Sequence, residues 1–270
     1  MQNTRVLPDL DRISVLAATV LLALILSQLA NFPERSLQLQ LPGLYLEFQI
    51  NIRTLISLLV SALTVTGADW LMRDHPHLGN RSTLPHWLLP AVTAWALSAI
   101  LFLLPRGFAW WTAFFTGGVI LMLVMIGEYI SIDQDHPYYF PAAMGLTALA
   151  YTVFFALAVT IHTAQLRLYL FLPIILTGAW LVSLRALSLR LGQSWPFWES
   201  MTVVFLTAQL AAVFHYWPVT SVSFGLLLLG PIYGCVNLIS NISEQSSLRR
   251  ILASLIVPII LTWGIAFLSL

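Results

Sequence analysis

Two segments of the chain contain Asp-His-Pro, and each follows an apolar run that ends near an acidic residue. The first reads Arg73-Asp74-His75-Pro76-His77, and the second reads Asp133-Gln134-Asp135-His136-Pro137. Imidazole and carboxylate groups together can bind a divalent metal ion or transfer protons. The candidate acid–base residues are Asp74, His75, Asp135 and His136, and the candidate metal ligands are His75, His77, Asp135 and His136.

A structural interpretation competes with this chemistry. Aspartate before His-Pro favours a tight turn, and loops at a membrane surface are rich in such residues. The sequence has no specific metal-binding motif such as H-E-x-x-H. Histidines titrate near neutral pH, so a cluster of them could also sense pH. A metal site, a proton relay and a pH sensor are therefore hypotheses beside the preferred interpretation, a turn.

The elements that must position these loops are apolar runs of membrane-spanning length. Hydrophobic residues make up 59% of the 270 residues and charged residues only 9%, whereas a soluble domain has about 25% charged residues. A helix of ~20 apolar residues crosses the hydrocarbon core and satisfies its own backbone there. We therefore expect one polytopic domain over residues 1–270, folded as an all-α transmembrane bundle. The predicted spans are 13–31, 53–72, 87–104, 109–130, 141–162, 168–186, 199–216, 219–240 and 251–269.

One connection has a different periodicity. Between residues 36 and 52, apolar and polar residues alternate on both sides of Pro42-Gly43, a period of two that is typical of strands. We predict a small external β-hairpin here, either a structural lid, which we prefer, or a docking edge for a partner strand. A two-stranded hairpin is marginal in water, so it should lie against the bundle or the lipid interface. The apolar face that would make this contact is Leu39, Leu41, Leu46, Phe48 and Ile50.

Asp69 and Glu128 each lie in the last turns of an apolar run. A charge at the bilayer centre costs ~2.5–3.5 kcal/mol, and less near the interface. These intramembrane polar residues could be protonated, paired with Arg73 or Arg81, or facing a water-filled cavity. Pairing is the preferred interpretation, while a cavity would indicate a proton or cation pathway.

Gly230 and Gly234 form a G-x-x-x-G spacing, which lets another helix approach closely, and Pro231 between them should kink the helix. We expect helix packing at these glycines rather than a transport site. His162 and His215 near span ends raise the hypothesis of a bis-histidine haem, but no second pair or supporting motif accompanies them. Hydrogen bonds at the headgroup region are the preferred role of these histidines, and no cofactor is expected.

The charged residues indicate orientation and exclude several functions. All twelve basic residues are arginines and there is one cysteine, which excludes a lysine Schiff base, a cysteine zinc site and an internal disulfide. Eight arginines fall at the amino terminus and in even-numbered connections and four on the other side, so we predict a cytoplasmic amino terminus. The net charge of +1 provides no field for nucleic acid. Membrane lipids are the expected partners, and a protein partner or a homo-oligomer is left open.

The segments Gly67-Ala68-Asp69-Trp70, Asp74-His75-Pro76-His77 and Tyr216-Trp217-Pro218, together with Gln209, resemble an uncharacterised family of bacterial multi-spanning membrane proteins. The resemblance implies a bacterial plasma membrane and no particular activity. No catalytic motif is recognisable and the loops are short, so we prefer a non-enzymatic protein, either transporter-like or a subunit of a membrane complex. The alternative is a membrane-embedded enzyme that acts on a lipid or lipid-linked substrate through the two Asp/His loops.

Overall fold

The computed structural model describes residues 10–29, 35–41, 44–50, 52–73, 75–79, 82–192 and 195–268. The chain divides into two compact units, Met1–Tyr139 and Phe140–Leu270. Three features of the sequence-based predictions lie outside the described residues: Asp74, Arg81 and the turn at Pro42-Gly43.

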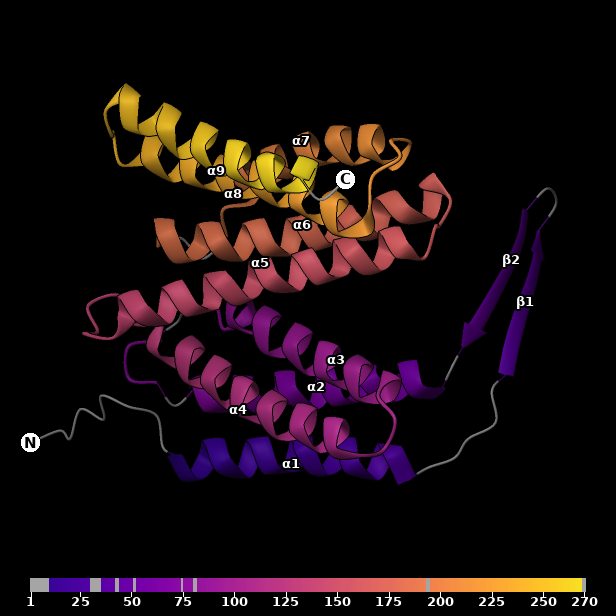
Figure 1. Cartoon of the computed structure of the whole chain (residues 1–270). Coiled ribbons are helices and arrows are strands. Elements are labelled where there is room, and N and C mark those ends of the chain that lie inside the picture. The colour runs from indigo at the N-terminus through magenta and orange to yellow at the C-terminus, as the bar shows by residue number, and fades with distance from the viewer. Residues whose placement is uncertain are drawn as a thin grey trace, which may run out of the picture. The chain divides into compact units, whose positions relative to one another are not determined.

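Unit 1 holds four long helices, a short 3-10 helix and a pair of strands. Neighbouring helices pack along the chain order, α1 on α2, α2 on α3 and α3 on α4, and α1 also packs on α4. The elements are α1 (Leu10–Leu29), β1 (Arg35–Leu41), β2 (Leu44–Ile50), α2 (Ile52–Arg73), η1 (Leu84–His86), α3 (Leu88–Leu103) and α4 (Phe108–Ile130) (Figure 1).

Within the described residues of unit 2, all regular secondary structure is helical. Its helices α6 and α7 pack together, as do α7 and α8 and, most closely, α8 and α9. The elements are α5 (Tyr139–Thr163, of which the first residue belongs to unit 1), α6 (Leu168–Leu191), α7 (Phe197–His215), α8 (Ser221–Ser243) and α9 (Leu248–Leu268) (Figure 1).

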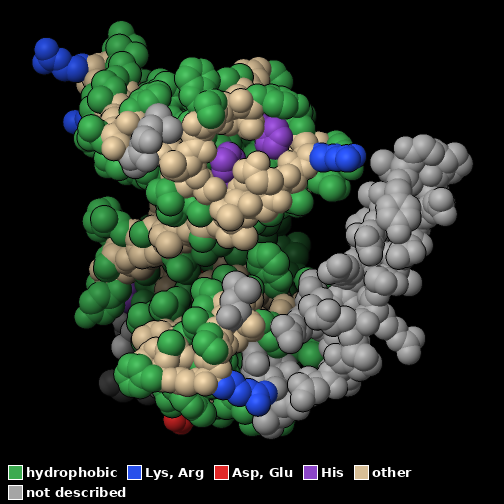
Figure 2. All heavy atoms as spheres, turned by 45° about the vertical axis from the view of Figure 1, so that its right-hand side comes forward, with side chains coloured by type: hydrophobic (Ala, Val, Ile, Leu, Met, Phe, Trp, Pro, Cys, Tyr) green, Lys and Arg blue, Asp and Glu red, His purple; other side chains and the backbone are tan. Residues whose placement is uncertain are grey.

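The long helices carry the composition of membrane spans. Among the described residues, eight helices are long and apolar enough to cross a membrane, namely α2 to α9, and α1 has 20 residues. Among the coloured side chains on the face shown in Figure 2, hydrophobic ones predominate over charged ones. The α-helical part of the predicted fold is therefore confirmed, with eight helices meeting the criterion for a span.

The strands lie in the segment of alternating residues. β1 and β2 run antiparallel, and their register places Leu37 opposite Phe48, Leu39 opposite Leu46 and Leu41 opposite Leu44.

The core of unit 1 forms where small residues let helices approach. A Cβ atom at Gly67 of α2 would lie 2.1 Å from Leu16 Cδ2 of α1, and one at Gly117 of α4 would lie 2.1 Å from Leu97 Cδ1 of α3. Each glycine thus receives a leucine from the neighbouring helix, which supplies the close packing that drives helix association in lipid.

Helices α8 and α9 of unit 2 pack through the G-x-x-x-G segment. A Cβ atom at Gly234 would lie 2.9 Å from the carbonyl oxygen of Leu255, and one at Gly230 would lie 1.9 Å from Thr262 Oγ1. Between them, Pro231 has no N–H to donate to the carbonyl of Leu227 four residues earlier. The indole Nε1 of Trp263 in α9 donates to that carbonyl at 3.1 Å.

Candidate functional site

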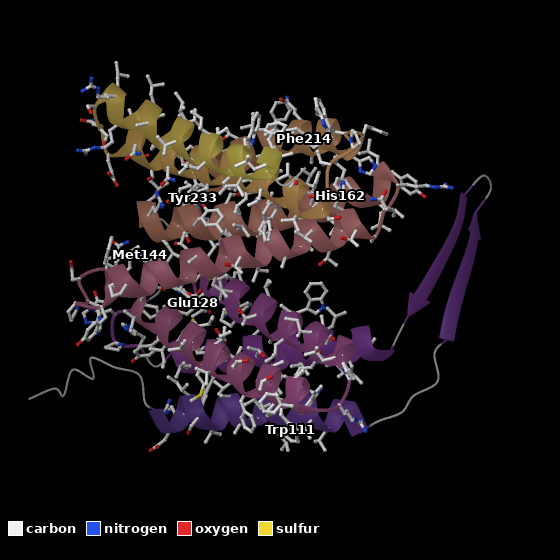
Figure 3. The ribbon with its side chains drawn as sticks, viewed as in Figure 1. Trp111, Glu128, Met144, His162, Phe214 and Tyr233 are labelled. Carbon is white, nitrogen blue, oxygen red and sulfur yellow. The ribbon has the colours of Figure 1, made fainter. Side chains whose placement is uncertain are left out.

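A buried carboxylate lies at the end of α4. The Glu128 side chain is fully buried (0% exposed), and its Oε2 lies 2.8 Å from Nδ1 of His86, which is 14% exposed. Glu128 is labelled on α4 in Figure 3. This is a short hydrogen-bond distance between an imidazole and a carboxylate, and it places the two side chains in direct contact.

Ser131 completes the surroundings of this pair. As the residue after α4, it donates its hydroxyl to the backbone carbonyl of Glu128 at 2.8 Å. The same Oγ lies 3.4 Å from Glu128 Oε2 and 3.3 Å from His86 Nδ1. Ser131 Oγ therefore lies within hydrogen-bond distance of both members of the pair.

Asp69 holds the segment that carries His86. Its two carboxylate oxygens accept from Thr83 Oγ1 at 2.6 Å and from Arg73 Nε at 2.8 Å. The carbonyl of Thr83 in turn accepts the backbone N–H of His86 at 3.0 Å. Asp69 therefore ties the last turns of α2 to Thr83, the residue before η1, and it is a positioning residue for the His86–Glu128 pair.

The two Asp-His-Pro loops have the same local structure. His75 Nδ1 accepts the backbone N–H of His77, and His136 Nδ1 accepts the N–H of Tyr138, both at 3.1 Å. In each loop the backbone N–H of the histidine also donates to the backbone carbonyl three residues earlier. The backbone carbonyl of the histidine accepts the N–H of the residue three positions later. The imidazole thus replaces the side chain of an Asx turn, and in the neutral ring the proton is on Nε2.

His75 lies in a buried position against α4. Its ring contacts the ring of Tyr129 edge-on, with 4.5 Å between centroids. Burial first, and then the nearby His77, lower the pKa of His75 from 6.5 to about 4, although Asp133 opposes this change. His75 is therefore neutral at physiological pH.

The remaining loop residues are more open to solvent. His77 Nδ1 lies 3.9 Å from Asp133 Oδ2, and the His77 side chain is 58% exposed. Asp135 is exposed, and its backbone N–H is bound by Asp133 Oδ1 at 3.1 Å. Within the described ranges, no three His, Cys, Asp or Glu side chains are arranged to hold a metal ion.

Comparison with known proteins gives a family without an assigned activity. Residues 32–269 match the family described as Protein of unknown function (DUF5656). The chain belongs to this family. No curated protein matches the chain, and no solved structure does. The function must therefore be argued from the residues of this chain.

The histidines of unit 2 pack against phenyl rings. His162 stacks on Phe224 with 4.5 Å between centroids, and His215 packs on Phe171 at 4.6 Å. His162, labelled at the end of α5 in Figure 3, is also hydrogen bonded through Nδ1 to Ser221 Oγ at 3.1 Å. Bis-histidine haem needs two imidazoles aimed at one iron, and these contacts do not fit that arrangement.

The pairing of His86 with Glu128 was not predicted from the sequence. The two residues are 42 positions apart, so no helical spacing relates them. The available signal was a buried acid in the last turn of a span, which needs a polar partner near the same end of the unit. His86, just before a predicted span, was the histidine that satisfied this condition.

Proposed function

We propose that this chain is a non-enzymatic, carrier-type protein of the bacterial plasma membrane, in which the Glu128–His86 pair binds and releases a proton. The observation that supports this proposal is the fully buried Glu128 carboxylate 2.8 Å from an imidazole at the end of an apolar helix. Ionisable groups inside membrane domains are costly and commonly mark proton or ion pathways. The arginine distribution supports a cytoplasmic amino terminus, which would place the pair near the cytoplasmic surface.

The Asp-His-Pro loops fit an enzyme less well. A general base needs a ring nitrogen that is free to take a proton. In His75 and His136, Nδ1 already accepts a backbone N–H, and Nε2 carries the proton of the neutral ring. Protonating either ring at Nδ1 would break its turn, which supports a structural role for both loops.

The test is proton exchange by the purified full chain. Infrared difference spectra recorded across a pH step in lipid vesicles should show a carboxyl C=O band that disappears in Glu128→Gln and shifts in His86→Gln. Glu244→Gln, at an exposed carboxylate after α8, is the matched control and should keep the band. An unchanged band in Glu128→Gln would refute proton binding at the pair.

A second arm addresses the enzyme alternative. Asp135→Asn and His136→Asn should leave proton exchange intact, because these residues lie outside the buried pair. If instead the purified protein altered lipid-linked substrates in a manner lost in these two variants, the carrier proposal would give way to the enzyme. A protein that co-purifies at fixed stoichiometry would replace it with the role of a complex subunit.

A further inference from the structure

An apolar groove runs along α1 and α2 within unit 1. It has a volume of about 280 Å³, slightly below the ~300–1,000 Å³ of pockets that enclose drug-sized ligands. Its lining comes from one face of each helix, at positions i, i+3, i+4 and i+7 of α2 and at positions i, i+1 and i+4 of α1. The residues are Val15, Leu16 and Thr19 of α1 and Leu63, Thr66, Gly67 and Trp70 of α2.

The surface of the groove is apolar, because the hydroxyls of its two threonines are already hydrogen bonded within their own helices. Thr19 Oγ1 donates to the carbonyl of Val15 at 2.7 Å, and Thr66 Oγ1 donates to that of Leu63 at 2.9 Å. Val15 is 63% exposed and Trp70 is 49% exposed. Since both helices have span length, these exposed apolar walls suit a lipid tail and not water.

A cation lies at one end of the groove. The guanidinium carbon of Arg12, one turn before Val15 on the same face of α1, lies 4.9 Å from the centre of the Trp70 ring. This is a cation–π distance, and the contact keeps the positive charge of Arg12 beside Trp70, which lines the groove. Arg73 continues the groove face of α2 at the same end, with a side chain that is 70% exposed and bound through Nε to Asp69.

We propose that this groove binds one acyl chain of an anionic phospholipid, whose phosphate lies against Arg12. The apolar faces of α1 and α2 fit a single chain, and the arginine at the groove end fits a negative headgroup. Asp11 and Asp69 lie at the same end, but Asp69 is engaged by Arg73 and Thr83. The Arg12 guanidinium contacts the Trp70 ring of the groove. The predicted orientation puts this end at the cytoplasmic leaflet, where anionic lipids attract arginines.

The test uses native mass spectrometry of the full chain with phosphatidylglycerol and phosphatidylcholine of identical acyl chains. The wild-type protein should retain one phosphatidylglycerol in preference to phosphatidylcholine. Arg12→Gln should weaken retention about fivefold, the effect of one arginine near an anionic headgroup. Its matched control is Arg249→Gln, at an exposed arginine in the first turn of α9, which should retain the lipid as the wild type does.

Thr66→Phe tests the groove itself. The added ring should fill the space and remove retention of phosphatidylglycerol, whereas Thr116→Phe, at an exposed threonine of α4, should not. Equal losses in Arg12→Gln and Arg249→Gln, or full retention in Thr66→Phe, would overturn the proposal. A dimer that Thr66→Phe converts to monomers would overturn it in favour of a second copy of the chain. Glu128→Gln should not affect lipid retention, so this result is independent of the proton-binding proposal.

Discussion

Removing His86 and Glu128 separately and together measures how strongly the buried pair is coupled. The variants are His86→Ala, Glu128→Gln and the double substitution. A hydrogen bond to a charged group contributes about 1.5–3 kcal/mol to the free energy of unfolding, and the pair is 2.8 Å apart with Glu128 fully buried. We therefore expect a coupling free energy of about 1.5–3 kcal/mol between the two sites.

The assay is reversible unfolding in mixed detergent micelles, followed by circular dichroism, for all members of the cycle. The protein contains its own control in His77 and Asp133, a more open pair whose side chains are 3.9 Å apart and 58% and 21% exposed. The cycle of His77→Ala and Asp133→Asn should give a coupling of about 0–1 kcal/mol, as for exposed ion pairs. Both cycles report on the same end of the same unit, so differences in detergent or lipid content cancel.

A coupling between His86 and Glu128 that is no larger than that between His77 and Asp133 would contradict this prediction. Such a result would mean that the buried carboxylate is stabilised mainly by other contacts. The His86–Glu128 pair would then not be the centre of the site. The proton-exchange experiment on Glu128→Gln would no longer test proton binding by the two residues together.

Three further predictions concern the loops and helix packing. Burial lowers the pKa of His75 to about 4, so the unfolded chain binds more protons than the folded chain between pH 6.5 and 4. The contribution of His75 to stability should be complete above pH 6.5 and should fall as the pH drops through this window, as followed by thermal unfolding. His75→Asn keeps the hydrogen-bond acceptor of the turn and should weaken this pH dependence. Gly234→Ala should destabilise unit 2 by about 1–3 kcal/mol in detergent unfolding, because its Cβ would lie 2.9 Å from a backbone oxygen, whereas Gly145→Ala, with no atom within 4 Å, should not destabilise it. Thr220→Ala removes the cap that accepts a backbone N–H at the start of α8 and should lower the unfolding free energy by about 1 kcal/mol in the same assay. A flat pH profile, equal effects at both glycines, or an unchanged unfolding midpoint for Thr220→Ala would each contradict the corresponding argument.

The helices were predictable because lipid imposes their length and composition. The helix boundaries were less predictable than the helices themselves, as α6 shows. Its span was expected to end at residue 186, near Arg185, whereas the helix continues to Leu191 and stops at Gly192 with φ of 65°. Charged residues mark the membrane surface, but the helix ends only where its backbone is capped. The glycine after Arg190 was the sequence signal for that end.

The candidate site was predictable in part. The Asp-His-Pro spacing indicated turns, and both loops have the local hydrogen bonds of a turn. The pairing of His86 with Glu128 depends on how η1 and α4 come together, which no local periodicity encodes. The metal and acid–base roles of His75 and His136 stay hypotheses, with their Nδ1 atoms already bound by the backbone.

The bond from Trp263 to the Leu227 carbonyl has a consequence for biogenesis. Until α9 enters the bilayer, the carbonyl that Pro231 leaves without an N–H donor has no partner from α9, and an unsatisfied carbonyl in hydrocarbon costs several kcal/mol. The two helices should therefore enter the bilayer together, as a hairpin in which Trp263 already binds that carbonyl.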